Sequence, residues 1–123
     1  MLSLTKSLAF SAIVLSSQLL WSPAVVADEK LAAEIAEGQN LAFTRKKGNC
    51  LACHKIEGGK AAGNIGPPLL MMKIRFPDKA KLRAQIADAT VANKNTRMPP
   101  FEKHGILTAA EIDKVATFIH SLK

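Results

Sequence analysis

Cysteine and aromatic residues are scarce in this chain, which has two cysteines, five phenylalanines, one tryptophan and no tyrosine in 123 residues. Both cysteines belong to one short motif, so none remains for a disulfide or for a second redox centre. No segment after residue 27 has the pattern of a β-strand, and the chain shows no internal repeat and no sign of a second domain. These absences predict a single small all-α domain.

The N-terminal segment has the three parts of a secretory signal peptide. Residues 1–6 are weakly basic, residues 8–20 form an apolar run, and small residues lead up to Ala27. The apolar run is too short to span a bilayer comfortably, so an uncleaved membrane anchor is the weaker alternative. We predict that residues 1–27 are removed on export to the periplasm and that residues 28–123 form the mature domain, without a membrane span.

The motif that contains both cysteines, Cys50-Leu51-Ala52-Cys53-His54, has the spacing of an attachment site for a covalently bound haem. Residues three positions apart lie on one side of a helical turn, so Cys50 and Cys53 can each form a thioether to a haem vinyl group. His54 follows directly and can present its imidazole to the iron as the proximal ligand. We therefore predict one covalent haem c.

Two other kinds of site also use a Cys-x-x-Cys pair. A thiol-disulfide redox site is expected within a βαβ pattern, which this sequence lacks. A zinc site needs four ligands, and the remaining His104 and His120 are poorly spaced to complete one. Bacterial covalent haem attachment takes place after export, so the signal peptide and the haem motif support each other.

The predicted mature domain keeps only four aromatic residues, Phe43, Phe76, Phe101 and Phe118. This is a thin core for a domain near the lower size limit of easy stability. A haem would supply a large, flat, apolar body around which such a core can form.

Basic residues outnumber acidic ones, and the formal net charge of the full chain is +7. A basic surface favours acidic partners or anions and raises association rates at low salt. No nucleic-acid-binding motif accompanies the charge, so nucleic acid is not an expected partner.

Three main helices are predicted in the mature domain. The first covers residues 31–44, with Gly38 as a point where another helix can approach closely, and the second covers about 79–91. The third follows a capping box formed by Thr108 and Glu111. We expect the first and last helices to pack together.

The residue opposite His54 on the iron decides what a haem site can do. Met98 lies in a loop directly before Pro99 and Pro100, whose rings fix φ and stiffen the loop. We therefore expect the Met98 sulfur to be the second axial ligand. A thioether ligand raises the reduction potential, and two filled axial positions are typical of an electron carrier rather than an oxygen-activating centre.

Other residues near the motif are given different roles. Met71 and Met72 lie in an apolar run and are expected in the core. His120 suits the C-terminal end of the last helix as a surface or capping residue. A backbone carbonyl in residues 66–69 can accept the Nδ1–H of His54 and fix its tautomer.

The sequence around these residues resembles SoxX, the monohaem c-type subunit of the SoxAX sulfur-oxidation cytochrome. The haem motif itself is common to c-type cytochromes, whereas the segments around Pro67 and Met98 are more discriminating. The resemblance covers nearly all of the predicted mature chain, and the segments that carry it are 48–54, 63–69, 75–78, 97–101 and 104–108.

This resemblance implies a class I cytochrome c fold in which Cys50 and Cys53 carry the haem and His54 and Met98 ligate it. It also implies a periplasmic heterodimer with a SoxA-type haem subunit. That complex couples thiosulfate oxidatively to a cysteine thiol of a SoxY-type carrier protein, as an L-cysteine S-thiosulfotransferase. The chain itself would pass electrons to an acceptor cytochrome and would have no sulfur-chemistry site of its own.

One residue departs from the expected pattern, because Glu102 stands where a glycine is expected after the Met-Pro-Pro-Phe run. A carboxylate there could change the shape of the loop or the charge near the haem. Two alternatives stay open, namely a free-standing class I cytochrome c that serves a terminal oxidase, and a haem peroxidase or gas sensor with an open sixth site.

Overall fold

Helices make up all of the regular secondary structure in residues 23–123, the part of the chain that the computed structural model describes. Apart from the helices, these residues contain one isolated β-bridge, between Ile56 and Leu69. The predicted all-α class is therefore confirmed. Most of the predicted signal peptide, residues 1–22, lies outside the described residues. The helices in chain order are α1 (Pro23–Phe43), the 3-10 helix η1 (Cys50–Ala52), α2 (Met72–Arg75), α3 (Lys79–Ala87) and α4 (Ala109–Ser121).

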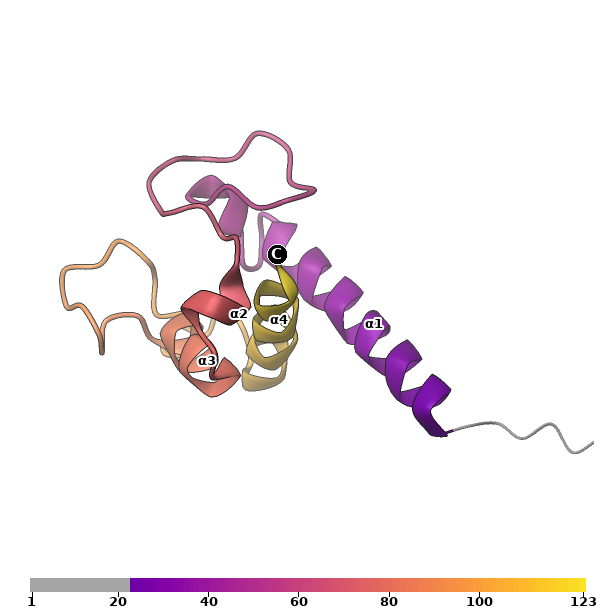
Figure 1. Ribbon diagram of the computed structural model, residues 1–123. Helices are drawn as coiled ribbons and strands as arrows, with labels where there is room; N and C mark the ends of the chain where they lie inside the picture. The colour runs from indigo at the N-terminus through magenta and orange to yellow at the C-terminus, as the bar shows by residue number, and fades with distance from the viewer. Residues whose placement is uncertain (1–22) are drawn as a thin grey trace, which may run out of the picture.

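The two longest helices, α1 and α4, pack against each other as predicted (Figure 1). Gly38 lies where they come closest, because a Cβ atom there would fall 2.7 Å from the carbonyl carbon of Lys114 and 2.8 Å from Cβ of Phe118. Next to this contact, the rings of Phe43 and Phe118 meet edge to face with their centroids 5.8 Å apart. The predicted role of Gly38 is confirmed.

Helix α1 begins at Pro23, earlier than the predicted start at residue 31. Proline is favoured in the first turn of a helix, and the alanine, glutamate and lysine residues that follow are strong helix formers. The helix therefore runs through the predicted cleavage position after Ala27. Its first turns extend beyond the body of the domain in Figure 1, with Val25, Val26 and Leu31 exposed.

Capping side chains define the ends of α3 and the start of α4. Asp78 accepts a hydrogen bond from the backbone N–H of Ala80 and begins α3. Asp88 accepts hydrogen bonds from the backbone N–H and the hydroxyl of Thr90, a local turn that ends α3 earlier than the predicted residue 91.

The capping box predicted at the start of α4 is present. The backbone N–H of Glu111 donates to Thr108 Oγ1 at 3.2 Å, and that of Thr108 donates to Glu111 Oε2 at 2.9 Å. From this start, α4 buries Ile112, Val115 and Ile119 in the core that it shares with α1 and α3.

Candidate haem site

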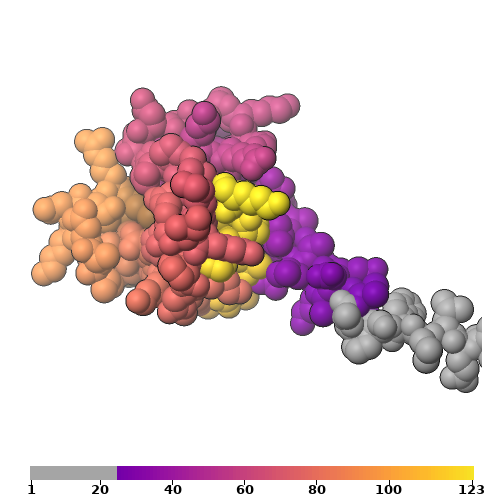
Figure 2. Space-filling view, viewed as in Figure 1, coloured from indigo at the N-terminus to yellow at the C-terminus, as the bar shows by residue number. Residues whose placement is uncertain are grey.

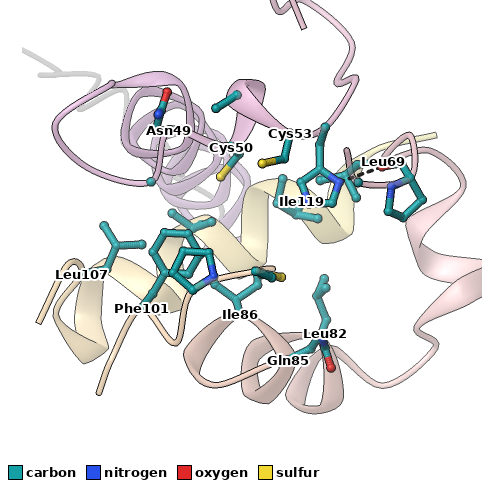
Figure 3. A pocket seen from close by; sticks show the side chains of 18 of the residues that line it. Asn49, Cys50, Cys53, Leu69, Leu82, Gln85, Ile86, Phe101, Leu107 and Ile119 are labelled. Atoms are coloured by element: carbon teal, nitrogen blue, oxygen red, sulfur yellow. Dashed lines mark hydrogen bonds between the residues drawn. The ribbon is translucent and has the colours of Figure 1, made fainter. Parts of the chain in front are cut away.

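Cys50 begins the 3-10 turn η1 and Cys53 directly follows its last residue, Ala52. A short turn, residues 44–49, connects η1 to α1. Backbone N–H groups of Cys53 and His54 both donate to the carbonyl of Cys50, at 3.2 and 2.9 Å. The tight turn directs both thiols to the same side, into a cavity (Figure 3), and the cysteines are not joined by a disulfide. The predicted helical turn is therefore present in its 3-10 form. Asn49 precedes it in a left-handed conformation without a side-chain capping bond.

The cavity below η1 has a volume of about 620 Å³, which is in the range of a small-molecule or cofactor site. Figure 3 places the cysteines on one wall, Leu82 and Ile86 of α3 on the facing wall, and Ile119 of α4 behind. All four residues predicted for the site line this one cavity, although they come from distant parts of the sequence. They are Cys50, Cys53, His54 and Met98.

The imidazole of His54 is held from one side by the loop at residues 66–68. His54 Nδ1 lies 2.7 Å from the carbonyl oxygen of Pro67. A carbonyl can only accept, so Nδ1 carries the proton and Nε2 is left as the metal-binding nitrogen. This contact confirms the predicted role of a backbone carbonyl in residues 66–69.

Gly66 allows this loop to lie flat against the imidazole. A Cβ atom at Gly66 would fall 2.6 Å from Nδ1 and 2.9 Å from Nε2 of His54, well inside the ordinary contact distance of 3.4 Å. The glycine is therefore required by the close approach of the backbone to the ring.

Arg75 supports the same loop, a role that the sequence alone does not indicate. Its Nη1–H donates to the carbonyl of Pro68 at 2.8 Å and lies 3.5 Å from the sulfur of Met72. The side chain also lines the cavity. The bond joins a helix to an irregular loop, so no periodic pattern in the sequence indicates it.

Two methionines line the cavity, and their environments differ. Met72 is 1% exposed, and its sulfur is in contact with Arg75. Met98 is half-buried in the loop before Pro99, where its backbone N–H donates to Thr96 Oγ1 at 3.1 Å. Burial of Met72 confirms its predicted place in the core.

Met71 is not a core residue, and its predicted place there is wrong. It is 50% exposed and precedes α2 with φ of 50°, a left-handed conformation in which its side chain is turned outward while that of Met72 is turned in.

Glu102, which stands where a glycine was expected, does not line the cavity. Its carboxylate instead faces the guanidinium of Arg83 on α3, at 4.0 Å.

The chemistry of the thiols does not favour the alternative kinds of site. Burial raises the pKa of Cys50 to about 11, so the group is a neutral thiol at pH 7, whereas catalytic redox cysteines have a lowered pKa. Within residues 23–123, no three His, Cys, Asp or Glu side chains gather as a metal ion would require. His104 is exposed, and Nε2 of His120 donates to the carbonyl of Phe76 at 3.0 Å.

The donor set fits a covalent haem: two thiols, an imidazole with a free Nε2, and a thioether around a largely apolar cavity. The fold and the site thus define a small all-α domain built around one flat apolar cofactor. The family model for cytochrome c matches residues 35–123, which is most of the chain, and the chain therefore belongs to the cytochrome c family. It is a c-type cytochrome, an electron carrier with covalently bound haem c.

Comparison with curated proteins gives no match. Among residues 23–123, none of the helices combines the length and the apolar character that crossing a membrane requires.

Proposed function

We propose that this cytochrome is the SoxX-type electron-transfer subunit of a periplasmic complex that oxidises thiosulfate. One observation carries the proposal. The segments that resemble SoxX come from separate parts of the sequence, yet 48–54, 63–69, 75–78 and 97–101 each contribute residues to the cavity wall. The resemblance is therefore concentrated at the site that would carry the electron.

In this proposal Cys50 and Cys53 would hold the haem through two thioethers, and His54 and Met98 would be the ligands of its iron. Bound haem supplies an iron that alternates between the ferrous and ferric states. The Pro67 carbonyl keeps the proton on Nδ1 of His54 and makes the ring a more basic ligand. The thioether of Met98 would favour the ferrous state, and with His54 also bound the iron would have no open position for oxygen or peroxide.

The partner in this proposal is a SoxA-type haem subunit, and together they act on a SoxY-type carrier protein. Both cysteines of this chain are committed to the haem, so the bond between thiosulfate and the carrier thiol is made on the partner. This chain accepts the released electrons and passes them to an acceptor cytochrome. A basic surface, with a net charge of +7 for the full chain, suits association with acidic redox proteins.

Association tests the proposal. The holoprotein is mixed with the purified SoxA-type subunit of the same organism and analysed by size-exclusion chromatography with detection of haem absorbance. We expect a stable complex containing both haem proteins. If the protein elutes only as a monomer at every concentration tested, the SoxX assignment is wrong, and a free-standing carrier that serves a terminal oxidase replaces it.

A further inference from the structure

Helix α2 and the two residues before it expose an apolar surface that nothing in the described residues covers. Leu70, Met71 and Ile74 are 43%, 50% and 75% exposed. The backbone N–H of Ile74 donates to the carbonyl of Met71 at 3.0 Å, and Leu70 precedes Met71 in the chain, so the three residues belong to one short surface segment. We call these three residues the α2 patch. Clustered large apolar side chains on a protein surface often mark a contact site.

The backbone holds the α2 patch in place. Met71 adopts the left-handed region at φ of 50°, which is unfavourable for a residue with a long side chain. Its carbonyl accepts hydrogen bonds from the N–H groups of Ile74 and Arg75, and the next residue, Met72, donates to Leu122 at 3.1 Å. Strained conformations that are held firmly in this way are common at binding sites. The flexible, polarisable side chain of methionine also suits protein contacts.

The α2 patch lies next to the haem cavity. Met72 and Arg75 are in the same helical turn as Ile74, and both line the cavity. Leu69, just before the patch, lines it as well. A single helical turn therefore separates the patch from the cavity. A partner seated on α2 would bring its own redox centre close to the site, and electron transfer is steeply faster at short distance.

Charge indicates which kind of surface would fit. Between residues 55 and 76 the chain has four basic residues and one acidic residue, Glu57. Lys73 and Arg75 flank the patch on α2, and Lys123 follows Leu122, which contacts the start of α2. In Figure 2 the segment around residues 70–76 forms a ridge down the middle of the visible face, with the C-terminal residues beside it. The complementary surface is apolar with an acidic rim.

We propose that the α2 patch is the docking surface for the SoxA-type haem subunit, through an apolar area on that subunit surrounded by acidic side chains. This inference rests on the proposed function, and it places the contact at α2. Burial of Leu70, Met71 and Ile74 supplies most of the affinity, while Lys73 and Arg75 raise the association rate.

The test uses the holoprotein, the purified SoxA-type subunit as the probe, and biolayer interferometry at low and at physiological salt. The variants are Ile74→Ser, the double variant Met71→Ser with Ile74→Ser, and Lys73→Glu. The matched control is Val91→Ser, because Val91 is also a large apolar residue, is 84% exposed and lies outside α2. The haem spectrum and melting temperature of each variant are compared with those of the wild type.

We expect the double variant to bind at least tenfold more weakly and Val91→Ser to bind within twofold of the wild type. Lys73→Glu should lower the association rate most at low salt. If the wild type binds and both patch variants bind equally well, the docking surface is elsewhere and the proposed function stands. If the wild type does not bind at all, the proposed function fails. Ile74→Ser alone decides the question if the double variant does not fold, because the side chain of Ile74 is 75% exposed and contributes little to the core.

Discussion

Alanine in place of Gly66 would put a methyl group 2.6 Å from Nδ1 and 2.9 Å from Nε2 of His54. The methyl group would lie closer still to Cε1 of the ring, so the imidazole or the loop must then move by about 1 Å to restore an ordinary contact of 3.4 Å. The hydrogen bond from Nδ1 to the Pro67 carbonyl, now 2.7 Å, would stretch beyond useful length. We expect a loss of about 1 kcal/mol from that bond, with a further about 1–3 kcal/mol from the crowding.

The assay for Gly66→Ala combines thermal unfolding of the holoprotein with redox titration of the haem. We expect a lower melting temperature and a changed midpoint potential, because His54 becomes a less basic and less well oriented ligand. Gly105→Ala is the matched control, since Gly105 has φ of 64° and no atom within 4 Å of an added Cβ. The control should lose some stability and keep its potential. A Gly66→Ala protein with the potential and melting temperature of the wild type would refute the reasoning.

Three further predictions address other parts of the molecule. Met98→Ala should retain the covalent haem but have a lower midpoint potential, and its ferric spectrum should lose the weak far-red absorption band that His/Met haem shows. An unchanged band would mean that another residue is the ligand. Gly38→Ala should destabilise the holoprotein by about 1–3 kcal/mol in urea unfolding, because the new methyl group meets the backbone of Lys114 on α4; a gain in stability would contradict the helix crossing. Hydrogen bonds from Lys47 and from the Thr108 N–H hold the pKa of Glu111 below its ordinary value of 4.5, so its contribution is present above about pH 4.5 and is lost as pH falls through the lowered pKa. Glu111→Gln should therefore be less stable than the wild type at pH 7, and the difference should shrink as the pH falls below 4.5. A difference in stability that does not change with pH would contradict this.

The features that sequence reasoning predicted correctly are those that local chemistry decides. The spacing of Cys50 and Cys53 within a helical turn and the capping box at Thr108 depend on neighbours in the chain. The contact of His54 with a carbonyl at residues 66–69 is longer in range, but glycine and two prolines define that loop strongly.

Features that depend on the backbone conformation of a single residue, or on one hydrogen bond between distant segments, could not be predicted from the sequence. Met71 and Met72 have the same side chain, and only the left-handed backbone at Met71 turns one out and the other in. Arg75 supports the loop through a single hydrogen bond to the carbonyl of Pro68, and no sequence pattern indicates such a bond. Helix α1 starts at Pro23, earlier than predicted, because helix propensity continues through the residues before Asp28. The cleavage motif that ends at Ala27 is not a boundary of the helix.

The thin core of this domain is sufficient because the cofactor site forms part of it. Only four aromatic residues follow Ala27, and aliphatic residues of α3 and α4 face the cavity from two sides. These side chains would pack on a flat apolar cofactor rather than on one another. The cavity and the core are therefore parts of one structure, and loss of the haem should cost stability as well as function.

The most direct test of the proposed function is reduction of the ferric haem by thiosulfate. The holoprotein is mixed in a stopped-flow instrument with the SoxA-type subunit and the SoxY-type carrier, and the ferrous absorption bands are followed after thiosulfate is added. The account predicts rapid reduction only when all three components are present. No reduction in the complete mixture, or equal reduction without the SoxA-type subunit, would contradict it.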